Sequence, residues 1–576
     1  PPRPCGLTPM SAAPALLNKL PTAAPGRSGR LLWAAALGCV IAGVVAWGTQ
    51  TLQGGVIGMW LFVAAAVLAA LVLPFTYALV SPLFFGLAGW LVDMLPLVVL
   101  AGWTAVALRW AYGLARERRL PAAGRWMWVP ALLTFWTALG IIVVSRSSIK
   151  HFLLLLGMQV IASAVIVACV DLLRTIEQRA DVVAGLTLFI VVLSAGVFLQ
   201  WVGVPIQPLQ NTEVSERVEE AYGVNAFPNL TGMIKYAFAQ ESGALDLKRA
   251  IGAADIEGIP RYEVFKPRFG AYENELVVRF EGSARPVEDD LARLGISLEF
   301  DNVGLADANS VPRLRSFPRN ALTYAGVSAA VFPLTFFLMW VGGKRRRFLG
   351  IAGAASCLFG AGFSLARGAW VAIALGVIYL LVDGRLSRTR KLQVLGAVIA
   401  GAAVLTTVFV VRYGDDPLNA RAGAQGSVGT RRALYEDTVQ KVDGLHILLG
   451  YGSERTRADE GDPTPGGRYI PPAGTHSTYL NYLFRTGVPG LLLIIALYAL
   501  AALHARASAL VREGDERLFS TLAATSIVIA GSHAVILSLY VEPIYDLVIS
   551  IVIGLATAGT LSLGASILPW RTRGKH

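Results

Sequence analysis

The fold is decided by an apolar run that follows a Gly/Pro-rich loop in the stretch Gly474-Thr-His476-Ser477-Thr-Tyr-Leu-Asn-Tyr-Leu-Phe-Arg-Thr-Gly487-Val-Pro-Gly490. The run continues to about residue 503, which is long enough for a helix to cross a bilayer. Comparable runs recur along the 576 residues, which are 55% hydrophobic and only 15% charged. Because soluble domains carry about 25% charged residues, the sequence predicts an all-α polytopic membrane protein.

Basic residues indicate how the predicted spans are oriented. The formal net charge is +12, and Lys and Arg gather in short segments between apolar runs, as at Lys344-Arg345-Arg346-Arg347. Such clusters mark cytoplasmic loops, so nucleic-acid binding is a poor explanation of the positive charge. The first apolar run follows a basic tail and precedes further spans, so we expect a span rather than a cleaved signal peptide.

Basic clusters and apolar runs together predict about fourteen transmembrane helices, with both termini in the cytoplasm. The region 56–113 is expected to hold three spans, broken near Pro74 and Pro96. The other expected spans are residues 31–48, 126–145, 151–171, 182–203, 321–341, 348–366, 369–383, 392–411, 477–503, 519–541 and 546–569.

Two long polar segments interrupt the spans on the predicted outer side. Residues 204–320 carry more acidic than basic residues, unlike the cytoplasmic loops. We expect a small α+β periplasmic insertion there, with helices at 212–222 and 230–252 and strands at 273–280 and 296–300. The expected divisions are N-terminal spans (1–203), the insertion (204–320), middle spans (321–411), an outer loop (412–476) and closing spans with a cytoplasmic tail (477–576).

The predicted topology puts three arginines and one histidine on the same outer side. Arg367, Arg431 and Arg432 are candidates for a phosphate clamp, because the planar guanidinium makes bidentate contacts with phosphate. Alternatively, Arg367 extends to the membrane interface, and Arg431 and Arg432 form a solvated helix face. His476 joins a long outer loop to a span, where a neutral imidazole can accept a proton from an acceptor hydroxyl.

Three further ionisable residues are secondary candidates. His533 lies inside the predicted span 519–541, and an ionisable residue in that position is a functional candidate. Glu542 and Asp546 lie at the outer turn of the last hairpin and form an alternative acid–base pair, although a structural turn is the simpler explanation. The outer loops contain no suitably placed Asp-x-Asp pair, which fits a site without metal or cofactor.

The spacing of residues between 318 and 500 resembles the signature region of the O-antigen ligase and O-antigen polymerase superfamily. In that family the outer loop begins with Arg and an aromatic four residues later, continues through Gly-x-Gly, and ends in His-(Asn/Ser), nine residues, Gly, two residues, Gly. The matching positions here are Arg431, Tyr435, Gly450, Gly452, His476, Ser477, Gly487 and Gly490. Two other elements are similar to family features: Ala366-Arg367-Gly368, with alanine where serine is usual, and Pro318-Arg319-Asn320 at the start of a span.

This resemblance implies a GT-C-like, metal-independent, inverting glycosyltransferase at the periplasmic face of the inner membrane of a Gram-negative cell. Its donor would be a glycan linked to undecaprenyl pyrophosphate, which Arg367 and Arg431 would grip with help from Arg432. His476 would deprotonate or orient the acceptor hydroxyl. The expected partners are this donor, a glycan-lipid or lipid A–core acceptor, membrane lipids and a polysaccharide chain-length regulator.

The sequence leaves four functions open. A polymerase that joins lipid-linked repeats is slightly favoured, because fourteen spans and an outer insertion suit an enzyme that handles two long glycan-lipids. A ligase would use the same chemistry to move the glycan onto lipid A–core. A transporter of lipid-linked sugars would use the arginines without making bonds, and a scaffold would bind a partner through residues 204–320.

Overall fold

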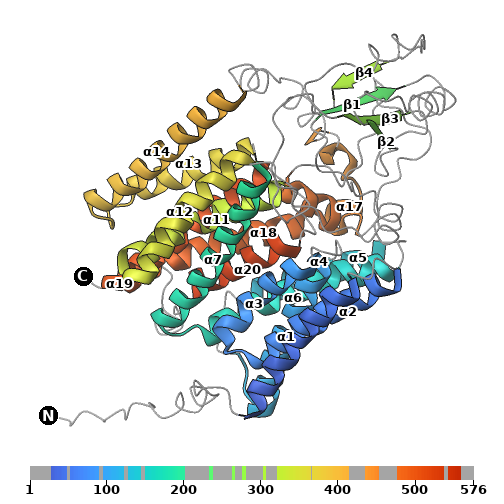
Figure 1. The fold of residues 1–576 in the computed structure, drawn as a ribbon, viewed down its shortest axis with the longest axis horizontal. Coiled ribbons are helices and arrows are strands. Elements are labelled where there is room, and N and C mark those ends of the chain that lie inside the picture. Colours follow the sequence, from blue (N-terminus) through green and yellow to red (C-terminus); the bar gives the residue numbers. More distant parts are fainter. Residues whose placement is uncertain are drawn as a thin grey trace.

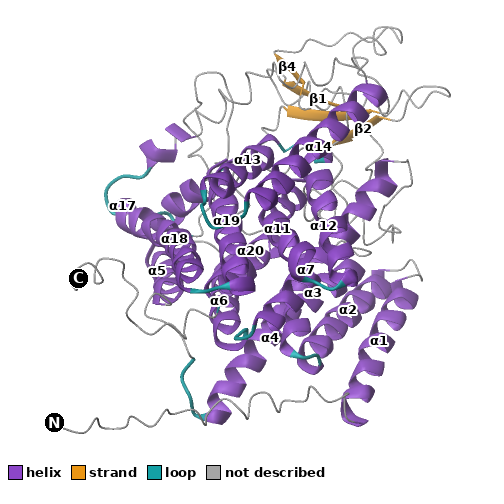
Figure 2. Ribbon diagram, turned by 90° about the vertical axis from the view of Figure 1, so that its left-hand side faces the viewer, coloured by secondary structure: helices purple, strands orange, loops and turns teal. Residues whose placement is uncertain are grey.

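The computed structural model describes most of the apolar part of the chain. Its helices form one bundle, and four short strands lie beyond one end of that bundle (Figure 1). A view from the side shows the same arrangement (Figure 2). The described residues are 27–47, 52–89, 95–121, 128–144, 149–201, 232–237, 262–265, 275–280, 302–305, 321–364, 366–413, 435–436, 438–452, 477–536 and 543–558.

A helix lies over each span predicted before the insertion. These helices are α1 (Arg27–Trp47), α2 (Leu52–Val72), α3 (Phe75–Gly89), α4 (Leu95–Glu117), α5 (Trp128–Val144), α6 (Ile149–Leu172) and α7 (Ile176–Trp201). Pro74 separates α2 from α3, because proline lacks an N–H group and clashes with the preceding turn. Pro96 lies in the first turn of α4, where the missing donor is tolerated.

The helices after the insertion also coincide with predicted spans. They are α11 (Ala321–Val341), α12 (Lys344–Phe363), α13 (Arg367–Val382), α14 (Arg388–Tyr413), α18 (Thr478–Val511), α19 (Gly514–Ile536) and α20 (Pro543–Thr557), with the short α17 (His446–Leu449) before α18. Among the described helices, 6 are long and apolar enough to cross a membrane, namely α4, α7, α11, α14, α18 and α19. The chain is therefore a multi-pass membrane protein, and the count of fourteen spans stays a prediction.

Helix α11 lies at the centre of the bundle. It contacts α7, α12, α13, α19 and α20, and its large side chains Tyr324, Phe332 and Phe337 are almost fully buried. Glycine lets a neighbouring helix come close, since a Cβ on Gly360 of α12 would lie 2.6 Å from the ring of Tyr324. Small residues at such crossings are favoured in membranes, where close packing rather than the hydrophobic effect holds helices together.

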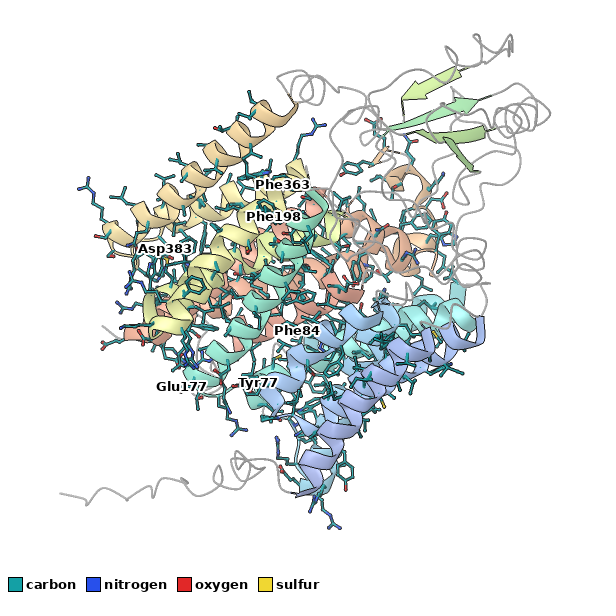
Figure 3. All side chains as sticks on the ribbon, in the orientation of Figure 1. Tyr77, Phe84, Glu177, Phe198, Phe363 and Asp383 are labelled. Atoms are coloured by element: carbon teal, nitrogen blue, oxygen red, sulfur yellow. The ribbon has the colours of Figure 1, made fainter. Side chains whose placement is uncertain are left out.

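The bundle has two distinct ends, which Figure 3 marks with labelled side chains. Glu177 and Asp383 lie at one end, where α7 begins and α13 has finished. Phe198 and Phe363 lie toward the opposite end, where α7 and α12 finish. We call the first the basic end and the second the strand end, because the four strands lie beyond it.

Ion pairs gather at the basic end. Arg179 of α7 is only 1% exposed and pairs with Glu516 of α19, which also pairs with Arg512. Arg119 binds both carboxylate oxygens of the buried Asp171 at 2.9 Å. The basic residues that follow α4 and those that follow α6 therefore meet at one end of the bundle, as expected for clusters on one side of a membrane.

The four strands fall within the predicted insertion. They are β1 (Gly232–Ala237), β2 (Tyr262–Phe265), β3 (Glu275–Phe280) and β4 (Asn302–Leu305), and they form one antiparallel sheet in the order β2-β3-β1-β4. The strand predicted at 273–280 contains β3. The predicted helix 212–222 and strand 296–300 lie outside the described residues, so the α+β character of the insertion stays a prediction.

The helix predicted at 230–252 is wrong over residues 232–237, which form β1. This strand pairs with β3 from Gly232 opposite Phe280 to Ala237 opposite Glu275. Its other edge pairs with β4. Hydrogen bonds to strands far away in the sequence decide the conformation of such a segment, and a local residue pattern does not contain them.

The buried pair at the basic end gives a stability prediction. Glu516→Gln leaves the guanidinium of Arg179 buried without a carboxylate, so we expect a loss of about 3–5 kcal/mol in the free energy of unfolding. Asp181→Asn is the matched control, because its partner Arg346 is 41% exposed and such pairs contribute at most about 1 kcal/mol. Thermal unfolding in detergent compares the two variants, and equal midpoints would contradict a buried Arg179.

Candidate functional site

Helix α18 changes direction at Gly487. The backbone there has φ 67° and ψ −170°, a region that is essentially restricted to glycine. A Cβ at this position would lie 2.5 Å from the carbonyl oxygens of both Ile447 and Leu448. The absence of a side chain at Gly487 therefore both permits the break in α18 and lets the backbone of α17 pack against it.

The break turns the first part of α18 back along the second part. In a continuous helix, Tyr479 and Tyr498 would be about 28 Å apart at 1.5 Å per residue, yet their ring centroids are 6.2 Å apart. The hydroxyl of Tyr479 also donates to the carbonyl of Gly531 in α19 at 3.1 Å. The span predicted over 477–503 therefore consists of two helical parts that meet at Gly487. Gly487 with Pro489 is the sequence signal for the break.

The Gly450-Tyr451-Gly452 turn joins α17 to the break. Gly450 and Gly452 both have positive φ, 64° and 62°, and a Cβ on Gly450 would collide with the backbone of Arg485. The N–H groups of Tyr451 and Gly452 donate to the carbonyls of Phe484 and Arg485 at 2.8 and 2.9 Å. Motif glycines that are far apart in the sequence thus form one backbone junction.

Trp136 of α5 ties this junction to the bundle. Its indole N–H lies 3.1 Å from the carbonyl oxygen of Leu448 and 3.0 Å from that of Thr486, and it donates to both. One turn further along α5, a Cβ on Gly140 would lie 2.7 Å from the carbonyl oxygen of Leu449. The N-terminal half of the chain therefore takes part in positioning the motif region.

A cavity that is partly open to the surroundings lies beside α18. Both parts of the broken helix line it, and the other walls come from α5, α6 and α20. Its lining residues are Leu133, Met158, Gln159, Ala162, Ile166, Thr478, Tyr482, Ile494, Leu497, Tyr498, Tyr545, Asp546, Ile549, Ser550 and Ile553. Its mixture of apolar surface with a few polar groups is typical of ligand sites.

Hydrogen bonds fix several of the polar groups around the cavity. The hydroxyl of Tyr482 donates to Oε1 of Gln159 at 2.9 Å, which joins α18 to α6. The hydroxyl of Ser550 donates to the backbone carbonyl of Asp546 at 2.7 Å. Asp546, a secondary candidate, thus lies on the cavity wall in the first turn of α20. Its predicted partner Glu542 lies outside the described residues.

His533, another secondary candidate, lies behind the wall of the cavity. Its side chain is 1% exposed, and Nδ1 is 3.4 Å from the hydroxyl of Tyr545, which lines the cavity. Its Nε2 has no hydrogen-bond partner among the described residues. Gly326 of α11 leaves room for both rings, because a Cβ there would lie 2.7 Å from Tyr545 and 2.8 Å from His533. His533 is therefore placed to orient Tyr545.

The main histidine candidate, His476, lies outside the described residues, but its neighbour Ser477 is placed. Ser477 is the N-cap of α18 and is 3% exposed. Its hydroxyl oxygen accepts a hydrogen bond from the N–H of Leu480 at 3.4 Å, which satisfies one of the donors at the helix start. The next residue, Thr478, lines the cavity, so the described chain resumes beside the cavity.

Arg367 begins α13 at the strand end of the bundle, and its side chain is exposed. The start of a helix attracts anions through its unpaired N–H groups and macrodipole, and the guanidinium adds a full positive charge there. Arg367 does not line the cavity. The other predicted residues Arg431, Arg432 and Asn320 lie outside the described residues.

The sequence alone does not single out Gln159, Tyr482, Tyr498 or Tyr545 as site residues. The available signal is weak, since a glutamine in the middle of an apolar run is one of the rare polar groups that membrane helices retain for a purpose. Only the folded chain brings these residues, from three helices, to one cavity. Within the described residues, no group of three or more His, Cys, Asp or Glu side chains could hold a metal ion.

The bundle and its cavity define a multi-pass α-helical membrane protein with a partly polar cavity between its helices. Residues 352–495, from α12 to the second part of α18, match the family model described as O-Antigen ligase. This segment therefore resembles the O-antigen ligase family, and the resemblance points, at a coarse level, to a membrane enzyme of the glycosyltransferase type. The matched segment includes Arg367 and both parts of the junction at Gly487. No curated protein matches the chain.

The junction predicts a strong effect of a single methyl group. We expect Gly487→Ala to lower the free energy of unfolding by about 1–3 kcal/mol, because alanine is strained at this φ/ψ. The collision of its methyl group with two carbonyl oxygens adds to this loss. Gly396→Ala is the control, since nothing lies within 4 Å of a Cβ at that helical position. Thermal unfolding and glycan transfer are measured for both. A Gly487→Ala protein with wild-type stability and activity would contradict the junction.

Proposed function

We propose that this chain is an inverting, metal-independent glycosyltransferase that polymerises glycan repeats linked to undecaprenyl pyrophosphate. The observation that carries the proposal is the break at Gly487, inside the segment that matches the O-antigen ligase family. The break sets the start of α18 beside a cavity that polar and aromatic side chains line. His476, the best general-base candidate, directly precedes that start in the sequence.

In the proposed reaction, an acceptor hydroxyl attacks the anomeric carbon of the donor glycan. The new glycosidic C–O bond forms while the C–O bond to the pyrophosphate breaks on the opposite face, so the configuration inverts. His476 takes the proton of the hydroxyl, a step that typically accelerates a reaction by about 10²–10⁴-fold. Undecaprenyl pyrophosphate leaves with the electron pair.

The three arginines act on the leaving group in this proposal. A guanidinium forms two parallel hydrogen bonds with a phosphate and keeps its charge at any physiological pH. Arg367, Arg431 and Arg432 would stabilise the negative charge that develops on the pyrophosphate, which is how fixed cationic groups commonly lower such barriers. The exposed position of Arg367 at a helix start supports its part, because a bound anion would also meet backbone N–H groups there.

We place the site at the periplasmic face of the inner membrane of a Gram-negative cell, with both termini in the cytoplasm. The concentration of Arg119, Arg179 and Arg512 at the basic end supports this orientation, since Lys and Arg clusters favour the cytoplasm. The loop before His476 then lies on the periplasmic side, where a lipid-linked donor is presented. A polysaccharide chain-length regulator is an expected partner there.

A ligase is the second candidate function, and the description of the matching family as O-Antigen ligase favours it. The donor and the chemistry would be the same, and the acceptor would be lipid A–core in place of a second lipid-linked repeat. A transporter of lipid-linked sugars is less favoured, because the description of the family that residues 352–495 match names a bond-forming enzyme.

The acceptor assay separates these functions and tests His476. Purified protein in detergent with chelator receives undecaprenyl-pyrophosphate-linked repeats and either a second lipid-linked repeat or lipid A–core. We expect products of increasing length with the first acceptor, and a loss of about 10²–10⁴-fold in kcat for His476→Ala, with unchanged thermal unfolding. Product with lipid A–core alone would establish the ligase. Full turnover by His476→Ala would refute the assignment of His476 as the general base. A requirement for Mg²⁺ would contradict the metal-free mechanism.

A substitution at Arg367 tests the pyrophosphate clamp. We expect Arg367→Ala to lower kcat/KM for the donor by about 10²–10³-fold, since one fixed electrostatic contact to the leaving group is lost. Arg367→Lys should recover part of this loss, because it keeps the charge without the bidentate geometry. Arg388→Ala is the control, for Arg388 is an exposed arginine that likewise begins a helix, at the basic end. Equal donor kinetics in Arg367→Ala and Arg388→Ala would refute the clamp.

A further inference from the structure

The cavity beside α18 contains a polar side chain that comes from the middle of an apolar helix. Gln159 lies in the middle of α6 (Ile149–Leu172), about 15 Å along the helix from its first residue. Its amide is held by Tyr482 through Oε1 and can still donate hydrogen bonds through Nε2. Polar side chains inside a membrane commonly mark the path of a polar substrate. An isoprenoid chain is a hydrocarbon and cannot form hydrogen bonds with such polar side chains.

Three tyrosines give the cavity aromatic walls. Tyr482 and Tyr498 come from the two parts of α18, and Tyr545 comes from α20. A pyranose ring carries C–H groups on its faces and hydroxyl groups around its edge. The face of an aromatic ring is negative and attracts such C–H groups, while amide, carboxylate and hydroxyl side chains bind the hydroxyls. The combination of Gln159 and Asp546 with tyrosine rings suits a sugar.

The walls of the cavity are held in place from outside. Tyr498 meets the ring of Tyr479 at 6.2 Å, edge to face. Tyr545 is backed by His533, which is 3.4 Å from its hydroxyl, and by Gly326, whose missing side chain lets both rings fit against α11. A site whose side chains are already fixed loses little entropy when a ligand binds, so this cavity is preorganised for a rigid ring.

We propose that this cavity binds one pyranose ring of the acceptor glycan between Tyr482, Tyr498 and Tyr545, with Gln159 and Asp546 bonding to its hydroxyl groups. The choice of acceptor over donor rests on the proposed function, because the general-base candidate His476 precedes the cavity-lining Thr478 by two residues. Gln159 and the tyrosines would then help decide which sugar is extended. His533 and Gly326 are positioning residues that act through Tyr545.

A cavity-filling variant tests the proposal. Ala162 of α6 lines the cavity, so Ala162→Phe places a ring in the space that the sugar would occupy. Ala400→Phe adds the same ring at an exposed position of α14 and is the matched control. Gln159→Leu is a second variant of nearly unchanged size, which removes the amide without filling the cavity. Thermal unfolding of each variant shows whether it is folded.

The probe is the free repeat oligosaccharide released from the cell's own surface polysaccharide by mild acid, and undecaprenyl monophosphate is the lipid control. Saturation-transfer NMR on full-length protein in detergent measures binding of each. We expect the sugar protons to receive saturation from the wild type, and a loss of affinity of at least about tenfold in Ala162→Phe and Gln159→Leu but not in Ala400→Phe. Sugar binding that is unchanged in Ala162→Phe and Gln159→Leu overturns the proposal. So does a cavity that binds undecaprenyl monophosphate and loses it in Ala162→Phe.

Turnover measured in parallel separates this inference from the proposed function. If Ala162→Phe and Gln159→Leu weaken sugar binding but the wild type turns over no acceptor, the sugar site is supported and the polymerase function is refuted. Wild-type turnover with an unchanged acceptor KM in folded Ala162→Phe and Gln159→Leu upholds the enzyme and overturns the sugar site. A raised acceptor KM with an unchanged donor KM supports both.

Discussion

The contact between the backbone of Gly487 and the carbonyl groups of Ile447 and Leu448 is the constraint on which the site depends. A carbonyl oxygen can approach so closely only where no Cβ intervenes, and the φ/ψ of Gly487 is open only to glycine. Gly450 must also lack a side chain, because a Cβ there would collide with the backbone of Arg485. The junction therefore has one stable arrangement, and no other residue can replace these glycines without moving the chain.

The reversal at this junction explains how a cavity can exist inside a tightly packed bundle. The first part of α18 is too short to cross a membrane, and it lies against the second part and α19 through Tyr479. A continuous helix would bring only one stripe of residues to the neighbouring helices α6 and α20. The folded-back helix brings two stripes of residues to them, so that Thr478 and Tyr482 line the same cavity as Tyr498. The ion pairs of Arg179 and Glu516 hold α7 and α19 together at the opposite end, away from this opening.

Much of the helical architecture could be predicted, because a bilayer imposes a length on each apolar run and backbone groups in hydrocarbon must be satisfied within the helix. The two breaks expected near Pro74 and Pro96 separate α2, α3 and α4 in the structure. The same reasoning failed where membrane constraints do not apply. Residues 232–237 pair with distant strands, whereas their local residue pattern predicts a helix. Of the site candidates, Asp546 lies on the cavity and His533 lies behind it, while His476 is known only through its neighbour Ser477.

The membrane class and the approximate helix positions follow from the sequence alone, because they depend on apolar run length and charge clusters. The spacing of glycine, arginine and histidine adds a resemblance to one superfamily. The fold then shows that the spaced glycines form a backbone junction. Gly450 and Gly487 are neighbours because two backbones must touch, and neither composition nor periodicity contains that distance. The tertiary structure also brings four side chains around one cavity, namely Gln159, Tyr482, Tyr498 and Tyr545. Each helix presents only one face to the cavity, and the way α18 folds back determines which face that is.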